Sequence, residues 1–349
     1  MKGNEAIAEA AIQCGCKMYF GYPITPQNEI PEYFAANLPK VGGVFLQAES
    51  EVAASNMLFG AASTATRAMV SSAGPGISLM QETISYMVGS RLPCVIINMA
   101  RGGPGLGNLS ATQADYFQST RGGGHGDYSM FTLAPASVQE ACDCVQLAFD
   151  IAEKYRQPVM VLGDAIIGQM MEPVAIKHVT PKPYDISWAA RGWDGKSRKK
   201  AEIGSLFHEP VMLAGMVSTL LDTYEKMKRE DVMFEEYNIE GAQYVIVAFG
   251  TVSRIVDSAI DILANKGLKV GMLRPITLFP FPDKAIARIA EMPSVKKMIV
   301  AEMNAGQMVY DVELAVKGRK EVLSLAKYGT LMPTPKEIAE FVLAQVETR

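Results

Sequence analysis

Hydroxyl and carboxylate side chains that could move protons stand in two short segments of the first quarter of the chain. Tyr22–Pro26 follows a short apolar stretch, and its two prolines restrict the backbone around the Thr25 hydroxyl. That hydroxyl could donate a hydrogen bond to a carboxylate. A Pro-x-x-Pro segment beside a strand is also typical of a rigid turn with no chemical role, and both interpretations stay open at this point.

Two acids, Glu49 and Glu51, stand between an extended segment and a helix of small apolar residues. The helix dipole stabilises acids at a helix N-terminus, so both could simply complete that helix. An acid that leads into an apolar helix is also expected to be partly buried, which suits it to sharing a proton. The spacing does not let both carboxylates face the same pocket.

Arg101 follows the apolar stretch Pro93–Met99 and begins the glycine-rich segment Arg101–Asn108. This segment has neither the Lys-Ser/Thr of a Walker loop nor the G-x-G-x-x-G spacing of a dinucleotide site, so it is a weak candidate for binding nucleotide phosphates. A guanidinium binds carboxylates through two hydrogen bonds, and we expect Arg101 to hold a carboxylate. A structural salt bridge fits the spacing equally well.

The remaining reactive side chains favour structural roles. His125 lies in a second glycine-rich loop, Gly122–Asp127, and a solvent-exposed histidine is favoured there over an acid–base residue or a contact to a partner. No metal ligands are predicted, because no zinc spacing and no C-x2-C-x2-C run occur. Five cysteines are expected to be small buried hydrophobes: Cys14, Cys16, Cys94, Cys142 and Cys144.

The elements that must position these residues alternate between strands and helices. Apolar strands are expected at 18–20, 68–70, 93–99 and 158–162, and helices at 3–15, 50–64, 77–89 and 137–155. This alternation predicts an α/β fold, with a parallel sheet covered by helices on both faces. Ligands of such sheets bind beyond the carboxyl ends of the strands, where Thr25, Glu51 and Arg101 lie.

The 349 residues are enough for two domains. We expect one domain over 1–172 and a smaller α/β domain over 241–349. Residues 173–240 are predicted to connect them, because the periodic pattern degrades there; within this stretch the basic run Arg198–Lys200 is expected to be a solvated face.

Composition and charge exclude several classes of function. The net charge of −4 provides no basic face for nucleic acid. Glu5 and Glu9 interrupt the N-terminal apolar pattern, which is unlike a signal peptide. No apolar run approaches the roughly 20 residues that span a bilayer. A soluble, cytoplasmic protein that contacts no membrane is expected.

Three segments in this order, Tyr22–Pro26, Gln47–Glu51 and Arg101–Pro104, resemble the 2-oxoacid:ferredoxin oxidoreductases. The resemblance continues through most of the chain, because Leu273–Pro280 and Glu302–Met308 resemble that family's second domain, as does Phe249–Val252. It implies a pyrimidine-binding thiamine diphosphate domain over 1–172 and a transketolase C-terminal-like domain over 241–349.

The same resemblance implies roles for individual residues. Glu51 would contact N1′ of the cofactor's aminopyrimidine and be the catalytic acid, while Thr25 and Arg101 would hold the carboxylate of the 2-oxoacid. The implied reaction is oxidative decarboxylation with coenzyme A as co-substrate and ferredoxin as electron acceptor. The other cofactor contacts would come from Tyr22, Pro23 and Ile24.

The resemblance also implies what this chain lacks. Thiamine enzymes bind the diphosphate and magnesium through a Gly-Asp-Gly motif with a later Asn. Gly163-Asp164-Ala165 is the nearest string, and no suitable Asn follows, so it is interpreted as a strand end. The diphosphate site, magnesium and iron–sulfur clusters are therefore expected on partners: a diphosphate-binding β subunit, a γ subunit and a ferredoxin-like iron–sulfur subunit. The enzyme would be an obligate hetero-oligomer, and this chain alone would be inactive.

Several functions stay open. The segment from Arg101 to Tyr128 looks most like the branched-chain (2-oxoisovalerate) enzymes, and the 2-oxoglutarate enzymes are close relatives. A pyrimidine-binding subunit of an NAD-linked 2-oxoacid dehydrogenase would share both domain types. A regulatory module that binds a nucleotide or a metabolite is disfavoured, because no phosphate loop with a lysine is present.

Overall fold

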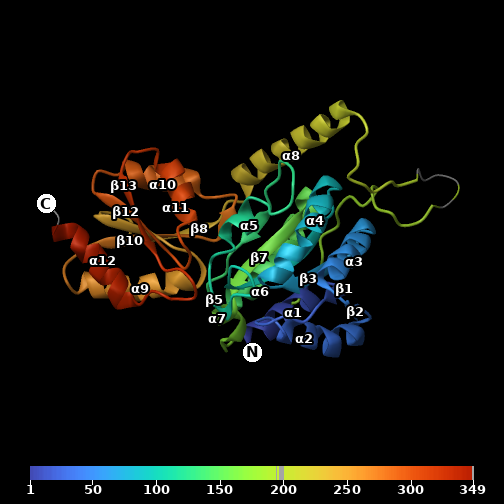
Figure 1. Cartoon of the computed structure of the whole chain (residues 1–349), viewed down its shortest axis with the longest axis horizontal. Coiled ribbons are helices and arrows are strands. Elements are labelled where there is room, and N and C mark those ends of the chain that lie inside the picture. The colour runs from blue at the N-terminus through green and yellow to red at the C-terminus, as the bar shows by residue number, and fades with distance from the viewer. Residues whose placement is uncertain (194, 196–199, 348–349) are drawn as a thin grey trace.

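A computed structural model describes residues 1–193, 195 and 200–347 of the chain (Figure 1). Arg198 and Lys199 of the predicted basic face therefore lie outside the described residues. The helices are α1 (Gly3–Gln13), α2 (Glu29–Asn37), α3 (Glu51–Ser63), α4 (Pro75–Gly89), α5 (Tyr116–Thr120), α6 (Val138–Tyr155), α7 (Ala165–Gln169), α8 (Pro210–Glu230), α9 (Gly250–Ala264), α10 (Asp283–Glu291), α11 (Met308–Val316) and α12 (Pro335–Glu347), with a 3-10 turn at Leu38–Val41.

Within the described residues, eight strands form the larger sheet. Along its main path the order is β11-β6-β7-β4-β3-β1-β2, and β5 pairs with β4 outside this path. All pairs from β6 to β2 are parallel, whereas β5 and β11 are antiparallel additions. The strands are β1 (Met18–Gly21), β2 (Val44–Gln47), β3 (Ala68–Ser72), β4 (Cys94–Gly102), β5 (Asn108–Ala111), β6 (Phe131–Leu133), β7 (Pro158–Asp164) and β11 (Thr277–Phe279).

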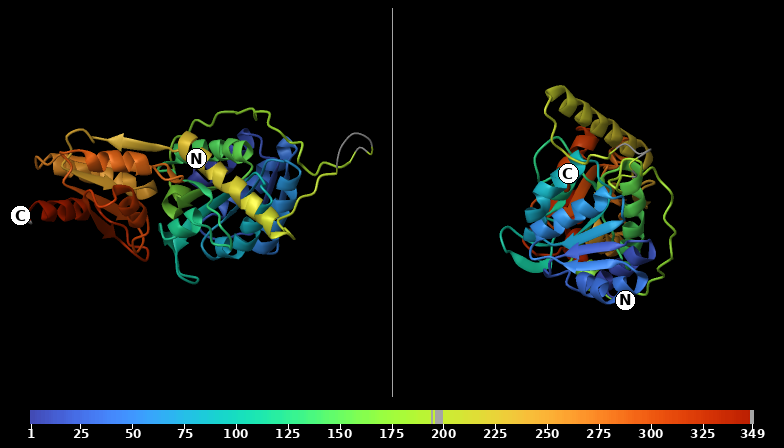
Figure 2. Two further views of the ribbon diagram at one scale, coloured as in Figure 1. Left: turned by 90° about the horizontal axis from the view of Figure 1, so that it is seen from above. Right: turned by 90° about the vertical axis from the view of Figure 1, so that its right-hand side faces the viewer.

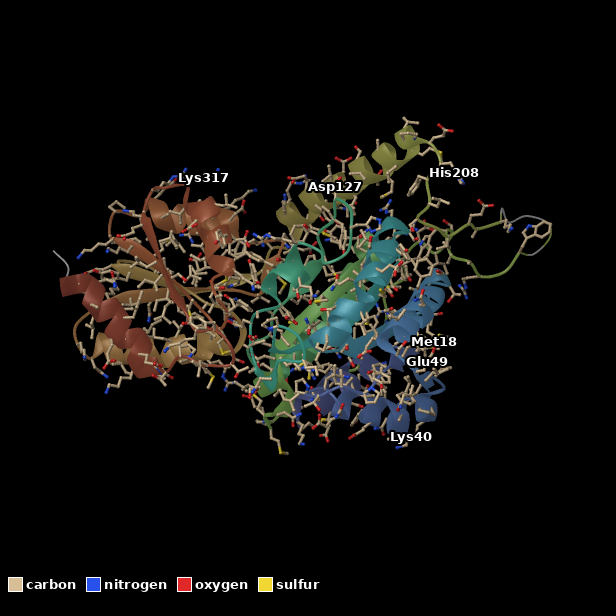
Figure 3. The ribbon with its side chains drawn as sticks, in the orientation of Figure 1. Met18, Lys40, Glu49, Asp127, His208 and Lys317 are labelled. Carbon is tan, nitrogen blue, oxygen red and sulfur yellow. The ribbon has the colours of Figure 1, made fainter. Side chains whose placement is uncertain are left out.

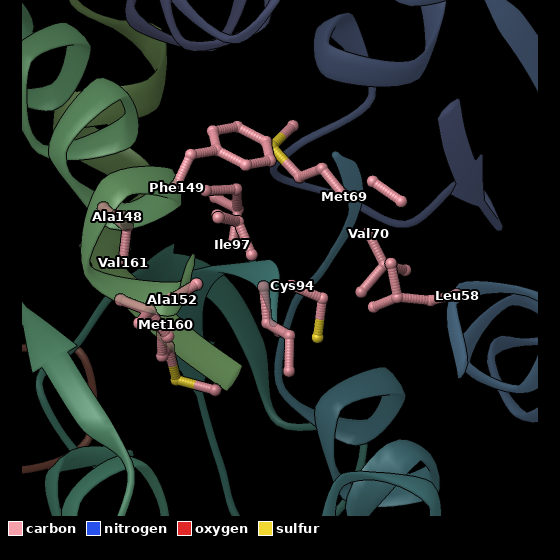
Figure 4. Close-up of a cluster of buried hydrophobic side chains, with 14 of the residues drawn as sticks. Leu58, Met69, Val70, Cys94, Ile97, Ala148, Phe149, Ala152, Met160 and Val161 are labelled. Carbon is pink, nitrogen blue, oxygen red and sulfur yellow. The ribbon is translucent and has the colours of Figure 1, made fainter. Parts of the chain in front are cut away.

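The central strands are buried on both faces, which explains their continuous apolar sequences. Side chains alternate between the faces, so neighbours in sequence meet different helices. Figure 4 shows Phe149 of α6 beside Met69, and Leu58 of α3 beside Val70. Helices α1 and α6 pack on each other, as do α3 and α4. The predicted parallel α/β sheet is confirmed.

A second sheet of five strands within the described residues lies beside the first (Figure 2). Its order is β13-β12-β9-β10-β8, parallel except for β8 at the edge. The strands are β8 (Phe234–Tyr237), β9 (Tyr244–Val247), β10 (Val270–Pro275), β12 (Lys297–Glu302) and β13 (Glu321–Ala326).

The segment predicted as a connection, residues 173–240, contains more regular structure than expected. Helix α8 packs Leu220, Tyr224 and Met227 into the core of the first sheet, and β8 joins the second sheet. The helical period was obscured because the N-terminal half of α8 is apolar yet largely exposed. The proposed domain limits at 172 and 240 remain a prediction.

Gln113 joins the two sheets through both its backbone and its side chain. Its backbone N–H donates to Met303 O at 2.9 Å, and its carbonyl accepts from the Asn304 amide at 3.0 Å. The side-chain amide donates to Phe249 O at 2.8 Å, and its oxygen accepts from Met303 N at 3.0 Å. Every polar group of this buried residue is thus paired across the joint.

The buried carboxylate of Glu302, at the end of β12, caps the N-terminus of α11. It accepts hydrogen bonds from the backbone N–H groups of Gln307 at 3.1 Å, Met308 at 2.8 Å and Val309 at 3.2 Å. The positive end of the helix dipole stabilises the buried charge. Gln307 in turn donates to Ala114 O at 2.8 Å, next to Gln113.

We predict that Glu302→Gln lowers the free energy of unfolding by about 2–4 kcal/mol, because an amide replaces a charged acceptor of several buried N–H groups. Urea denaturation measures the change. Glu313→Gln is the matched control, since Glu313 is exposed on the same helix and its replacement should change stability by no more than about 0.5 kcal/mol. Equal stability of the two variants would contradict the capping role.

Candidate active site

A chain of buried hydrogen bonds fixes the segment after β1 to the sheet. The Tyr19 and Ser71 hydroxyls lie 2.6 Å apart, and Ser71 also bonds to the side chain of Gln27. All three residues are buried. Gln27 follows directly after Tyr22–Pro26, so the turn is anchored to the middle of the sheet.

A second set of bonds holds the end of this turn. The Pro26 carbonyl accepts from the Asn4 amide of α1 at 2.8 Å and from Gln169 of α7 at 3.1 Å. The Thr25 side chain itself is exposed. Both interpretations of the segment are therefore compatible with its structure: the turn is rigid, and it presents one hydroxyl outward.

The structure separates the two acids that follow β2. Ser50 is the N-cap of α3 and accepts the Ala53 N–H at 3.1 Å, which makes Glu51 the first residue of the helix. The Glu51 side chain is only 7% exposed, whereas Glu49 is exposed. Glu51 is therefore the acid that faces the interior of this edge.

Gly76, in the first turn of α4, leaves the space that the Glu51 carboxylate occupies. A Cβ added at Gly76 would lie 2.6 Å from Glu51 Oε1 and would also meet the hydroxyl of Ser72 at the end of β3. The Ser72 hydroxyl is buried and has no hydrogen-bond partner among the described residues. The sequence interpretation did not single out Ser72 or Gly76 as site residues.

Arg101 connects the loops on either side of it. Its Nη1 donates to Thr25 O at 3.0 Å and its Nη2 donates to Leu106 O at 3.2 Å. Gly74 lies against its aliphatic stem, since an added Cβ there would be 3.2 Å from Arg101 Cγ. Arg101 forms no salt bridge with an acid of the described part of the chain, and its buried Nε has no partner there. The guanidinium therefore retains free donors.

A further polar pair lies on the same side of the sheet as Ser72. Asn98 of β4 is the register partner of Ser72, and its amide donates to the Asp115 carboxylate at 3.0 Å. Burial raises the pKa of Asp115. Neither residue stood out in the sequence, because an Asn inside an apolar strand and an Asp in a loop carry no motif.

Other residues considered from sequence lie away from this edge or are internally paired. Asp164 caps α7 by accepting from Ile166 N at 2.9 Å and Ile167 N at 3.1 Å, as expected of a strand end. His125 is exposed, in the loop whose Asp127 lies near α8 (Figure 3). All five cysteines are buried, and burial raises the pKa of the Cys14 and Cys142 thiols to about 12.

The arrangement brings together one buried carboxylate, one exposed hydroxyl and one guanidinium at the carboxyl ends of β1 to β4. The carboxylate can exchange a proton with a basic ligand atom, while the hydroxyl and guanidinium can hold an anionic group. No helix among the described residues has the length and apolar character needed to cross a membrane.

Comparison with protein families identifies both parts of the chain. The family described as pyruvate flavodoxin/ferredoxin oxidoreductase, thiamine diphosphate-binding, matches residues 9–232. The pyruvate:ferredoxin oxidoreductase core domain II matches residues 242–338.

Curated relatives extend over nearly the full length. The ketoisovalerate oxidoreductase subunit VorB of Methanothermobacter marburgensis is 46% identical, over 94% of this chain and 92% of the relative. The 2-oxoglutarate synthase subunit KorA of Methanocaldococcus jannaschii is 38% identical, over 98% of both chains.

Two solved structures are similar in fold. The 2-oxoglutarate:ferredoxin oxidoreductase from Magnetococcus marinus, with 2-oxoglutarate, coenzyme A and succinyl-CoA bound, aligns with 99% of this chain at a TM-score of 0.86 and 26% identity. This chain spans 65% of that longer chain. The second is a split-gene transketolase, solved as an inactive tetramer of four β subunits. It aligns with 99% of this chain and 97% of the transketolase chain at a TM-score of 0.62 and 14% identity, which shows a likeness of fold alone.

We predict that Gly76→Ala destabilises the chain by about 1–3 kcal/mol, because its Cβ must displace Glu51 and Ser72. Gly60→Ala provides the matched control within α3, where an added Cβ meets nothing within 4 Å. That substitution should instead stabilise the helix by about 0.5–1 kcal/mol. Urea denaturation compares the two, and a neutral Gly76→Ala would contradict the tight packing around Glu51.

Proposed function

Because the chain belongs to the 2-oxoacid:ferredoxin oxidoreductase family, we propose that it is the subunit that binds the pyrimidine end of thiamine diphosphate in such an enzyme. The complex would catalyse the coenzyme A-dependent oxidative decarboxylation of a 2-oxoacid and pass the electrons to ferredoxin. We further propose a branched-chain 2-oxoacid such as 2-oxoisovalerate as the preferred substrate.

The observation that carries this proposal is the position of Glu51. Its carboxylate is buried beside a glycine whose missing Cβ leaves room, at the edge where Thr25 and Arg101 also lie. A flat aromatic ring with a basic nitrogen fits this combination. Its nitrogen needs one acid as a partner, and its flat face needs the protein backbone to approach closely. The residues present therefore fit the pyrimidine of the cofactor.

When bound, thiamine diphosphate supplies the nucleophilic carbon that attacks the keto group and holds the electrons left by decarboxylation. The part of this chain is to hold and move one proton. Glu51 would exchange a proton with N1′ of the pyrimidine. Tyr22, Pro23 and Ile24 would contact the cofactor from the rigid turn, where anchoring by Gln27 reduces the entropy lost on binding.

The substrate carboxylate would be held between Arg101 and Thr25. Arg101 keeps its Nε–H unpaired, and the remaining N–H groups of the guanidinium allow a two-point contact with a carboxylate. Its bonds to Thr25 O and Leu106 O keep the guanidinium in place before substrate arrives. These contacts pre-organise the guanidinium for binding a carboxylate.

The preference for an apolar oxoacid rests on the loops that follow β1 to β4. Arg101 is the only lysine or arginine within 22–28, 48–50, 73–74 and 101–115, so these loops offer no second cation for a dicarboxylate. The hairpin after Arg101 instead exposes Leu106 and Leu109. The 46% identity to a ketoisovalerate subunit, against 38% to a 2-oxoglutarate subunit, supports the same choice.

The site is half of a catalytic centre, and partners would complete it. Asp164 caps α7, so the nearest string to a diphosphate motif is committed to structure. Thiamine diphosphate would therefore be shared with a β subunit that also holds magnesium. A γ subunit and a ferredoxin-like subunit with iron–sulfur clusters would complete the cytoplasmic hetero-oligomer. The relatives are themselves named as subunits.

A 2-oxoglutarate enzyme is the second candidate, favoured by several 2-oxoglutarate synthase relatives and by the solved Magnetococcus marinus enzyme. An NAD-linked dehydrogenase gains no support from these relatives. Purification of the chain with its natural partners, followed by assays of viologen reduction with 2-oxoisovalerate, 2-oxoglutarate and pyruvate, separates the candidates. A higher kcat/KM for 2-oxoglutarate would overturn the branched-chain preference.

We predict that Glu51→Gln lowers kcat for decarboxylation by about 10²- to 10⁴-fold, the contribution typical of acid–base catalysis, because an amide cannot exchange the proton. Size-exclusion chromatography should show the complex still formed, since Gln has the same size. Glu49→Gln, at the exposed neighbouring acid, should retain activity. Full activity of Glu51→Gln would rule out the assignment of Glu51.

We predict that Thr25→Val raises the apparent KM for the oxoacid by roughly ten- to a hundredfold, because one hydrogen bond to the substrate carboxylate is lost. Val keeps the shape of Thr, so the turn should persist. Thr219→Val is the control, since among the described residues that hydroxyl bonds to Gly215 O in α8 alone. An unchanged KM for Thr25→Val would contradict a carboxylate contact.

A further inference from the structure

Two adjacent serines end β3, and they serve different faces of the sheet. The Ser71 hydroxyl bonds to Tyr19 and to Gln27, so it belongs to the chain that anchors the turn after β1. Ser72 points to the opposite face, because side chains alternate along a strand. Only Ser71 therefore has its hydrogen bonds within the sheet.

The Ser72 hydroxyl is an exception to the rule that buried polar groups are paired. Ser72 is 0% exposed, and none of the described residues bonds to its Oγ. A buried hydroxyl without a partner costs about 1–3 kcal/mol, so an unpaired one in a native site calls for an explanation. Alanine at this position would avoid that cost.

The carboxylate of Glu51 lies close to this hydroxyl. Both Ser72 Oγ and Glu51 Oε1 crowd the single point where a Cβ of Gly76 would lie. Glu51 likewise has no hydrogen bond from any described residue to its carboxylate. A lone donor and a lone charged acceptor therefore stand next to each other at the first turn of α4.

We propose that Ser72 is the positioning residue of Glu51: its hydroxyl, which has no partner among the described residues, turns to donate to the Glu51 carboxylate when the pyrimidine binds, and then holds that carboxylate in the orientation that meets the ring. This inference rests on the proposed function and deepens it. Hydrogen bonds from a hydroxyl to a carboxylate are short and strong, and a carboxylate held by a partner loses less entropy on binding. Ser72 itself does not touch the substrate.

The surroundings explain why the hydroxyl is available to Glu51. On the neighbouring strand, the Asn98 amide N–H is committed to Asp115 at 3.0 Å, while the Asn98 side-chain oxygen is buried and accepts no bond from the Ser72 hydroxyl. Gly76 cannot supply a side chain, and Ser71 faces away. The Ser72 proton is thus the side-chain donor placed beside Glu51 by β3.

The test uses the complex assembled with its partner subunits and carrying Ser72→Ala. Calorimetric titration should show that the Kd for thiamine diphosphate rises by about two- to tenfold, since Glu51 must now be ordered on binding. Exchange of the cofactor's C2 proton with D2O, followed by NMR, should slow by about tenfold or more. The KM for the oxoacid should stay within twofold of the wild-type value.

Two further variants separate hydrogen bonding from packing. Ser72→Cys keeps the volume but has a weak donor, so it should behave like Ser72→Ala if the hydrogen bond matters. Ser90→Ala removes another buried hydroxyl without a partner, about 21 Å along α4 from Gly76, and should leave both measurements unchanged. If Ser72→Cys binds thiamine diphosphate and exchanges its C2 proton as the wild type does, the proposal is overturned. This test holds even if Ser72→Ala fails to assemble.

Glu51→Gln distinguishes failure of this inference from failure of the proposed function. If Glu51→Gln abolishes C2 exchange while Ser72→Ala exchanges at the wild-type rate, Glu51 acts without Ser72 and the positioning role is wrong. If Glu51→Gln exchanges normally, or the wild-type complex does not bind thiamine diphosphate, the proposed function itself is wrong.

Discussion

Parallel pairing of four strands determines where every candidate site residue lies. Gly21 pairs with Gln47 and with Ser71, while Ser72 pairs with Asn98, so the chain leaves β2, β1, β3 and β4 at the same edge of the sheet. The turn after β1, the start of α3, the start of α4 and the hairpin after β4 must therefore converge. This convergence, rather than any local motif, brings segments about 80 residues apart in sequence to one edge of the sheet.

At that edge the position of the Glu51 carboxylate depends on the absence of a side chain at Gly76. Gly76 admits the Glu51 carboxylate to a buried position where any Cβ would collide with it. Arg101 then closes the other side by bonding to the carbonyls of Thr25 and Leu106. The result is a rigid cluster of one acid, one hydroxyl and one guanidinium. Under the proposed function, this cluster holds one end of a cofactor whose other end is bound by a partner subunit.

The second sheet is connected to the same scaffold through polar contacts that leave little freedom. Gln113 bonds with all its polar groups to the ends of β9 and β12, and Glu302 fixes the helix whose Gln307 returns to Ala114. This joint begins two residues after β5, which pairs with β4, the strand that carries Arg101. The position of the second sheet is therefore coupled physically to the hairpin that follows Arg101.

Sequence alone determined the fold class, because continuous apolar strands between amphipathic helices leave few alternatives to a covered parallel sheet. It also determined the family, since Tyr22–Pro26, Gln47–Glu51 and Arg101–Pro104 occur in a specific order. Sequence could not distinguish Glu49 from Glu51 by burial, nor reveal Ser72. The burial of the Glu51 carboxylate near Ser72 depends on Gly76, which lies 25 residues beyond Glu51 and meets it only after α3 and α4 pack together. Helix α8 was missed for the related reason that its exposed apolar half has no sequence period to mark it. Only tertiary structure decided these points, because burial and pairing are properties of contacts between distant segments.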